Sequence, residues 1–86
     1  MPERRMTPTP ERAMKILGVR CRELRKEKGW AMVNLAAEAD ISQTVVSNVE
    51  GFRRGGIRLA AVLGMADAFG VSVSYLVGET DDRERG

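Results

Sequence analysis

The sequence predicts an all-α fold, a compact bundle of five short helices. Apolar residues make up 43% of the 86 residues but aromatic residues only 5%, and alanine, valine and leucine supply most of the rest. This composition favours a helical bundle over a β-sandwich or barrel. The apolar residues also recur at helical spacing, between residues that commonly begin and end helices. The length suits a single domain.

The first helix is predicted to follow a polar, disordered arm at residues 1–9. Thr9 can cap this helix, Pro10 suits its first position, and Gly29 ends it. The face that enters the core is expected to consist of apolar residues at helical spacing: Met14, Leu17, Cys21 and Leu24.

Two shorter helices are predicted next. One covers residues 30–38, and the other begins after Ser42, which can cap it, and ends near Gly51. Asp40 and Ile41 interrupt the helical pattern between them. The buried residues of the later helix are expected to be Val46 and Val49.

The fourth helix is predicted from about Arg58 to Phe69, after a loop at residues 53–57 that contains two glycines. Gly70 is its stop signal. Its apolar stripe is expected to comprise Leu59, Val62, Leu63, Ala66 and Phe69.

The last predicted helix is a short turn at residues 73–77, capped by Ser72 and closed by Gly78. A charged tail at residues 79–86 is expected to fray. The helical domain is therefore predicted to span residues 10–78.

The composition excludes several functions. The chain has one cysteine and no histidine, so it can form neither an internal disulfide nor a His/Cys metal site. Cys21 is expected to be a buried, inert thiol. Without histidine the commonest general base is absent, and we expect no enzyme, no metal and no cofactor. No stretch approaches the roughly 20 apolar residues of a membrane span, and no signal peptide is present, so a cytoplasmic location is expected.

The distribution of charge points to a polyanionic partner. The net charge is only +2, but residues 1–28 carry nine Lys/Arg against four acids, and three arginines cluster around residues 53–58. Acidic residues outnumber basic ones after Asp67. A basic side combined with an acidic end is typical of a protein that binds a polyanion.

The segment Met32–Phe52 has the pattern of a helix-turn-helix. Ala36 supplies the small side chain needed where the two helices approach each other, and Asp40 tolerates the positive φ of the turn. Ile41 can pack the turn onto the core. Two short helices joined this way suit a motif in which the second enters the DNA major groove.

The stretch Leu17–Glu79 resembles the phage-repressor and Cro-like helix-turn-helix family, called the XRE family. The resemblance is carried by GVRCRELR at residues 18–25, ISQTVVSNVE at residues 41–50 and GVSVSYLVG at residues 70–78. It implies a phage-repressor-like DNA-binding domain that contacts double-stranded DNA.

The resemblance also implies which residues act. The residues implied to contact base edges lie on the helix that follows the turn: Gln43, Thr44, Val45, Ser47 and Asn48. The residues implied to contact DNA phosphate groups are Ser42, Arg53, Arg54 and Arg58. Arg25 and Glu50 match a structural ion pair between the first and third helices.

The sequence departs from the family pattern at three places. Ala31 and Met32 stand where the family has a Ser or Thr and a Gln, which removes a helix cap and polar DNA contacts. Asp40 replaces the turn glycine, and Phe52 follows Gly51. Phe52 is expected to pack beneath the loop; the alternative is exposure at a partner surface.

The leading hypothesis is a sequence-specific repressor that binds pseudo-palindromic DNA as a homodimer and is nucleoid-associated when bound. Four residues near the C-terminus can form the dimer seam or belong to the core: Val71, Val73, Tyr75 and Val77. The alternative is a protein-interaction module, an antitoxin or repressor partner, because Ala31, Met32 and Val33 place apolar surface where a DNA reader is polar.

Overall fold

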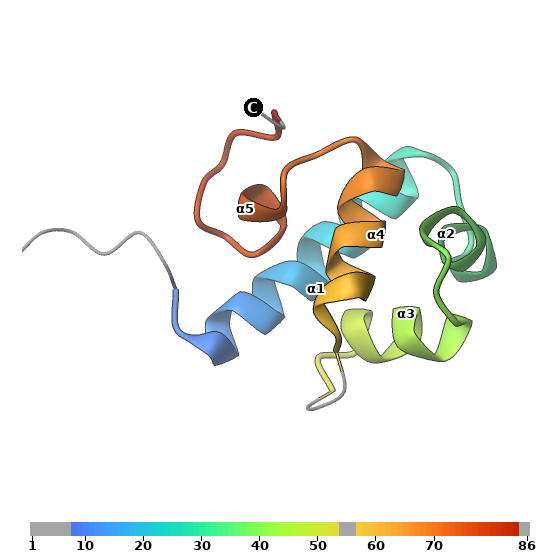
Figure 1. Ribbon diagram of the computed structural model, residues 1–86, viewed down its shortest axis with the longest axis horizontal. Helices are drawn as coiled ribbons and strands as arrows, with labels where there is room; N and C mark the ends of the chain where they lie inside the picture. The colour runs from blue at the N-terminus through green and yellow to red at the C-terminus, as the bar shows by residue number, and fades with distance from the viewer. Residues whose placement is uncertain (1–7, 54–56, 85–86) are drawn as a thin grey trace, which may run out of the picture.

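The computed structural model describes residues 8–53 and 57–84, which form five helices and no strand. They are α1 (Pro10–Glu27), α2 (Met32–Ala39), α3 (Gln43–Glu50), α4 (Leu59–Phe69) and α5 (Val73–Leu76) (Figure 1). The all-α prediction is confirmed. None of these helices is long and apolar enough to cross a membrane. Most of the predicted arm and the Gly55-Gly56 loop lie outside the described residues.

Short polar side chains set the helix starts. The hydroxyl oxygens of Thr9, Ser42 and Ser72 each accept a hydrogen bond from a backbone N–H three residues later, at 3.3, 3.1 and 3.0 Å. These bonds satisfy N–H groups that have no partner within the helix. All three predicted caps are confirmed.

The N-terminus of α2 has no such cap. Ala31 occupies the capping position, as the sequence pattern indicates, and its methyl group can accept no hydrogen bond. The Asn34 side-chain oxygen instead accepts a bond of 2.8 Å from the Ala31 N–H. This is one half of a capping box, and it partly replaces the missing hydroxyl.

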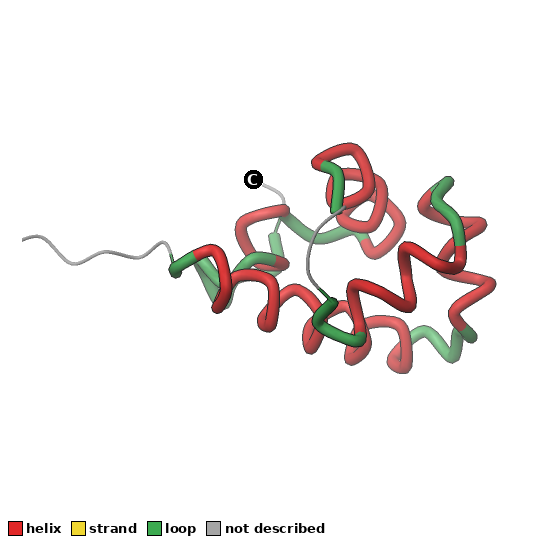
Figure 2. The backbone as a smooth tube through the Cα atoms, turned by 90° about the horizontal axis from the view of Figure 1, so that it is seen from below, coloured by secondary structure: helices red, strands yellow, loops and turns green. Residues whose placement is uncertain are grey.

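The helices enclose a single core. α1 is the longest helix and packs against α3, α4 and α5, while α2 packs against α3 and α4 (Figures 1 and 2). The fully buried large side chains are Cys21, Leu35, Val46, Val49, Met65 and Leu76, so every helix contributes to the core. α3 is thereby supported from one side by α1 and from the other by α2.

Two helix crossings require glycine. A β-carbon added to Gly18 of α1 would lie 2.5 Å from the backbone oxygen of Val49 at the end of α3. A β-carbon added to Gly64 of α4 would clash with the backbone oxygen of Ala39 at the end of α2. These close approaches bring α1 against α3 and α4 against α2.

The predicted apolar stripe of α4 was partly wrong. Leu59 and Leu63 are 68% and 50% exposed, whereas Ala61 and Met65 are buried. The helix is turned so that Gly64 faces the α2 backbone. This register moves Leu59 and Leu63 to the solvent side.

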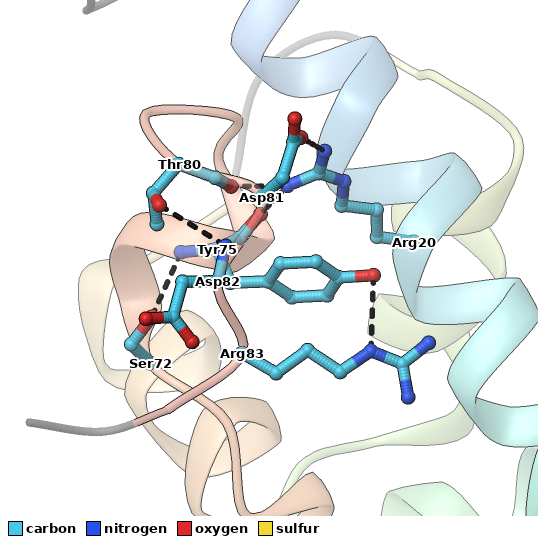
Figure 3. Close-up of polar contacts among 7 residues, drawn as sticks. All are labelled: Arg20, Ser72, Tyr75, Thr80, Asp81, Asp82 and Arg83. Atoms are coloured by element: carbon cyan, nitrogen blue, oxygen red, sulfur yellow. Dashed lines mark hydrogen bonds and ion pairs between the residues drawn. The ribbon is translucent and has the colours of Figure 1, made fainter.

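The tail was expected to fray, but residues 79–84 fold back on α1 and α5 (Figure 3). Arg20 of α1 donates to the backbone oxygens of Tyr75 and Thr80 and to Asp81. Arg83 forms a bidentate ion pair with Glu27, with N–O distances of 2.8 and 3.0 Å. The backbone oxygen of Arg83 accepts a hydrogen bond from the Ser72 N–H. Two local bonds add to these long-range contacts, from the Asp82 N–H to Thr80 Oγ1 at 3.0 Å and from the Glu84 N–H to Asp82 Oδ1 at 2.9 Å. We call residues 79–84 the C-terminal strap.

The Tyr75 ring lies between two guanidinium groups. The Arg20 and Arg83 groups are 4.2 and 5.4 Å from its centroid, and Arg83 also donates to its hydroxyl (Figure 3). Tyr75 and Val71 are buried, so these two residues belong to the core of the protomer. Val73 and Val77 remain partly exposed.

Candidate nucleic-acid interface

The turn between α2 and α3 has the predicted geometry. Asp40 adopts φ 58° and ψ 47°, a left-handed conformation that ends α2. The Ile41 N–H donates to the Ala36 oxygen at 2.9 Å, and the Ile41 side chain packs partly against the core. Ala36 is buried. The turn therefore fixes the angle between the two helices through local backbone conformation.

α3 presents a polar edge to solvent. Val46 and Val49 are buried, which directs the opposite side of the helix outward. On that side Gln43 and Thr44 are exposed, and Ser47 and Asn48 are partly exposed and lie one turn further along. Because the buried valines fix the helix, the side chains at its start lie on a rigid support.

Val45 lies apart from this edge. It is partly buried and packs against the core, and it lines a shallow groove with Ser42, Arg58 and Ala60. This groove runs between the start of α3 and the start of α4. Val45 therefore presents an apolar surface beside the polar edge.

The residues predicted to contact phosphate are only partly brought together. Ser42 lies in the same groove as Arg58, although its hydroxyl oxygen already caps α3. Arg53 is exposed after α3, and Arg54 lies outside the described residues. Arg58 precedes α4, whose start has no side-chain cap, so the first backbone N–H groups of α4 are open to an anion.

Arg25 and Glu50 form the predicted ion pair. Arg25 donates from Nε and Nη2 to the two carboxylate oxygens of Glu50 at 2.7 and 2.9 Å, and from Nη1 to the backbone oxygen of Trp30 at 2.8 Å. The side chains are only 11% and 3% exposed. The hydrogen bond to Glu50 raises the pKa of Arg25, so the guanidinium group stays charged. It fastens the end of α3 to α1.

Cys21 is the buried thiol that the sequence predicted. Its sulfur lies 3.7 Å from Glu50 Oε2 and 3.8 Å from the Met65 sulfur. Burial, reinforced by the Glu50 charge, raises the thiol pKa to about 12, so the reactive thiolate is scarce at neutral pH. Among the described residues no group of His, Cys, Asp and Glu side chains could bind a metal.

Phe52 combines the two outcomes considered for it. Its ring lies directly over Gly18 of α1, yet the residue is 46% exposed. Its φ of 60° is unusual for a residue with a β-carbon. The ring therefore packs on one face and meets solvent on the other.

Sequence reasoning missed several structural residues. Gly64 was read only as part of a helix, and Arg20 and Arg83 only as surface charge. The one available signal was a glycine inside a strong helical pattern, which commonly has a packing reason. The partners of Arg20 lie 55 to 61 residues away, so no local pattern reveals them.

A helix-turn-helix family model matches residues 22–76, which include the whole of α2, the turn and α3. Among solved structures, the chain is similar to the crystal structure of a hypothetical transcription factor, NHTF, from Neisseria. The two share 31% identity and a TM-score of 0.70, over 90% of this chain and 85% of the other. No curated protein sequence matches.

The left-handed turn at Asp40, the supported α3 and its polar edge define a helix-turn-helix domain. With the family match over most of its helices, the chain belongs to the XRE-type helix-turn-helix family.

Proposed function

We propose that this protein is a sequence-specific transcriptional repressor that binds pseudo-palindromic DNA as a homodimer. Family membership and the similarity to a hypothetical transcription factor support a DNA-binding regulator. The observation that carries the specific proposal is the polar start of α3, where Gln43 and Thr44 are exposed on a helix fixed by Val46 and Val49.

In this proposal α3 enters the major groove with its N-terminal end against the bases. The groove is about 12 Å wide, which admits a helix. The Gln43 amide can both donate and accept, so it can pair with N6 and N7 of adenine. Thr44, Ser47 and Asn48 offer further polar contacts, and Val45 offers an apolar contact to a thymine methyl group.

Phosphate contacts would position α3 without reading sequence. Arg58 and the open backbone N–H groups of α4 flank the groove beside Ser42 and Val45. Arg53 lies at the other end of α3, and we assign Arg54 to the same task. A phosphate at each end of α3 would fix the depth of the helix in the groove.

The length of α3 supports the proposed homodimer. A helix of eight residues reaches only a few base pairs, so two copies spaced about 34 Å apart supply the specificity of an operator. Repression needs only that the bound dimer occupy the site. Val73 and Val77, which stay partly exposed, are the remaining candidates for a seam near α5.

Selection of bound sequences from a random duplex library tests the proposal directly. We expect an enriched pseudo-palindrome whose half-sites are one helical turn apart. Gln43→Ala should weaken binding to the selected site by about 1–3 kcal/mol and relax preference at one base pair. Ser74→Ala on α5 is the matched control and should bind as the parent does. If Gln43→Ala binds the selected site with the affinity and base preference of the parent, base reading by Gln43 is contradicted.

One observation favours a second candidate, a protein-interaction module. Val33 at the start of α2 is 55% exposed, and Ala31 provides no polar side chain there. If duplex DNA at low salt fails to bind at tens of micromolar, a concentration at which even non-specific DNA binding is measurable, this second function replaces the first.

A further inference from the structure

One side of α1 is exposed and carries basic residues around an apolar one. Lys15, Val19, Arg22 and Lys26 follow one another at intervals of four, three and four residues, so they share one face of the helix. All four are exposed, Val19 by 45%. This face is opposite the residues by which α1 enters the core.

Phe52 extends this face with an aromatic ring. The ring lies against Gly18 and is 46% exposed, beside hollows lined by Met14 and Lys15 on one side and by Val19 and Arg22 on the other. Its positive φ is a conformation that residues with a β-carbon rarely adopt, and such outliers persist where the surroundings enforce them. We call Lys15, Val19, Arg22, Lys26 and Phe52 the α1 outer face.

Three arginines elsewhere in the fold are already paired, whereas the cations of this face, like Arg12, Arg53 and Arg58, are not paired with any carboxylate in the described part of the chain. Arg20, Arg25 and Arg83 each form an ion pair with a carboxylate. Lys15, Arg22 and Lys26 form none with the residues that the structure describes. Their charge is therefore available to an outside partner.

We propose that the α1 outer face is a docking site for an acidic amphipathic helix of a partner protein. The hollows beside Phe52 are lined from Glu11 to Lys26, roughly 22 Å along α1 at 1.5 Å per residue, which is the length of four helical turns. An apolar stripe would cover Val19 and Phe52 while flanking carboxylates meet the cations. Glu11 and Glu23 border the site and would repel a partner that is acidic on every side.

A protein partner suits this face better than DNA does. Phosphate groups gain nothing from Val19 and Phe52, and together these residues are the apolar centre of the face. The inference also goes beyond the proposed function, because it uses none of the base-reading or phosphate-contact residues. A failure of DNA binding would leave it intact.

The test uses a synthetic helical peptide of about 15 residues, with leucines on one face flanked by glutamates, titrated into the ¹⁵N-labelled protein. We expect shifts concentrated at Val19, Arg22 and Phe52. Val19→Ser with Phe52→Ser should weaken binding about tenfold or more, as loss of central apolar contacts does. Leu63→Ser removes an apolar side chain of similar exposure on α4 and should bind the peptide unchanged. A peptide with lysine in place of glutamate should not bind.

Three results would overturn the proposal. One is equal weakening by Leu63→Ser, which would mean that the peptide binds apolar surface at large. Another is displacement of the peptide by duplex DNA, which would mean that the face binds DNA. The third is self-association of the protein, seen as concentration-dependent sedimentation, that the Val19→Ser and Phe52→Ser double variant abolishes. This result would mean that the face is a contact between copies of the chain. If the double variant loses helical circular dichroism, Arg22→Glu replaces it, and unchanged affinity of this charge reversal would contradict the proposal.

Discussion

At the scale of single residues, the position of α3 depends on one charged contact. Arg25 donates two hydrogen bonds to the Glu50 carboxylate and a third, from the remaining end of its guanidinium group, to the backbone oxygen of Trp30. Both side chains have lost most of their water. Removing one partner therefore leaves the other charge buried without compensation, which costs more than the pair contributes to stability.

We predict that Glu50→Ala lowers the free energy of unfolding by about 3–5 kcal/mol, measured by urea denaturation. The exposed Glu23→Ala on α1 is the control and should change it by no more than about 0.5 kcal/mol. Similar values for the two variants would show that the pair does not stabilise the junction of α1 and α3.

The residues of the turn could be predicted because their roles are local. Ala36 and Asp40 follow from steric demands within a few residues, and Val46 and Val49 follow from helical spacing. The need for glycine at position 64 could not be predicted. It depends on the backbone of Ala39, which only the packed fold brings there.

At the scale of elements, α2 begins without a side-chain cap, as α4 does. The Asn34 and Leu35 N–H groups donate to the Ala31 backbone oxygen, and the Ala31 N–H donates to the Asn34 side chain, but no side chain accepts from the first N–H groups of the helix. The first N–H groups of α2 are thus left to water or to a ligand.

Ala31→Ser should stabilise the protein by about 1 kcal/mol, because a hydroxyl there can accept from the free N–H groups. Thermal unfolding followed by circular dichroism measures the effect. Ala37→Ser places the same side chain in the exposed middle of the helix and should be destabilising by up to about 0.5 kcal/mol. If both substitutions change the stability alike, the first backbone N–H groups of α2 already have hydrogen-bond partners.

Helix boundaries were predictable, whereas the rotation of α4 was not. Thr9, Ser42 and Ser72 mark helix starts by a bond within three residues, so the signal is contained in the sequence. The buried side of α4 is chosen by its crossing with α2. Leu59 and Leu63 have the right spacing for a stripe but lie on the side that no helix covers.

At the scale of the whole molecule, the proposed DNA contact has an electrostatic signature. Each phosphate neutralised contributes about −0.9 to the slope of log affinity against log salt. Arg58→Ala removes one such contact from each copy, so it should make the slope for binding of the dimer less negative by about 2 while preserving sequence preference. Arg12→Ala removes an exposed cation of α1 and serves as the control. A lost preference in Arg58→Ala would mean that this arginine reads sequence.

The C-terminal strap should open in acid. The hydrogen bond from Arg83 lowers the pKa of Glu27 in the folded protein. The stabilisation from this pair is therefore present above the ordinary pKa of a glutamate, about 4.3, and is lost as the pH falls through the lowered value. We expect the Ser72 amide, which bonds to Arg83, to lose protection from hydrogen exchange in that acidic range. In Glu27→Gln, the Ser72 amide should show this weaker protection already at neutral pH. If protection of the Ser72 amide changes neither in acid nor in Glu27→Gln, the Glu27–Arg83 pair does not hold the strap.

The strap also shows where prediction from sequence ends. Its composition is that of a mobile tail, and its order comes from Arg20 and Arg83, whose partners lie far away in the chain. Local patterns sufficed for the helices and for the family, but contacts of this range appear only in the assembled fold.

The burial of Cys21 gives the protein an internal reporter. It is the chain's one cysteine, and it lies where α1, α3 and α4 meet. Because the closed core shields the thiol and raises its pKa to about 12, alkylation can proceed only in molecules whose core has opened. The labelling rate thus reports how often α3 detaches from α1, and any ligand that prefers the closed form will slow it in proportion to occupancy.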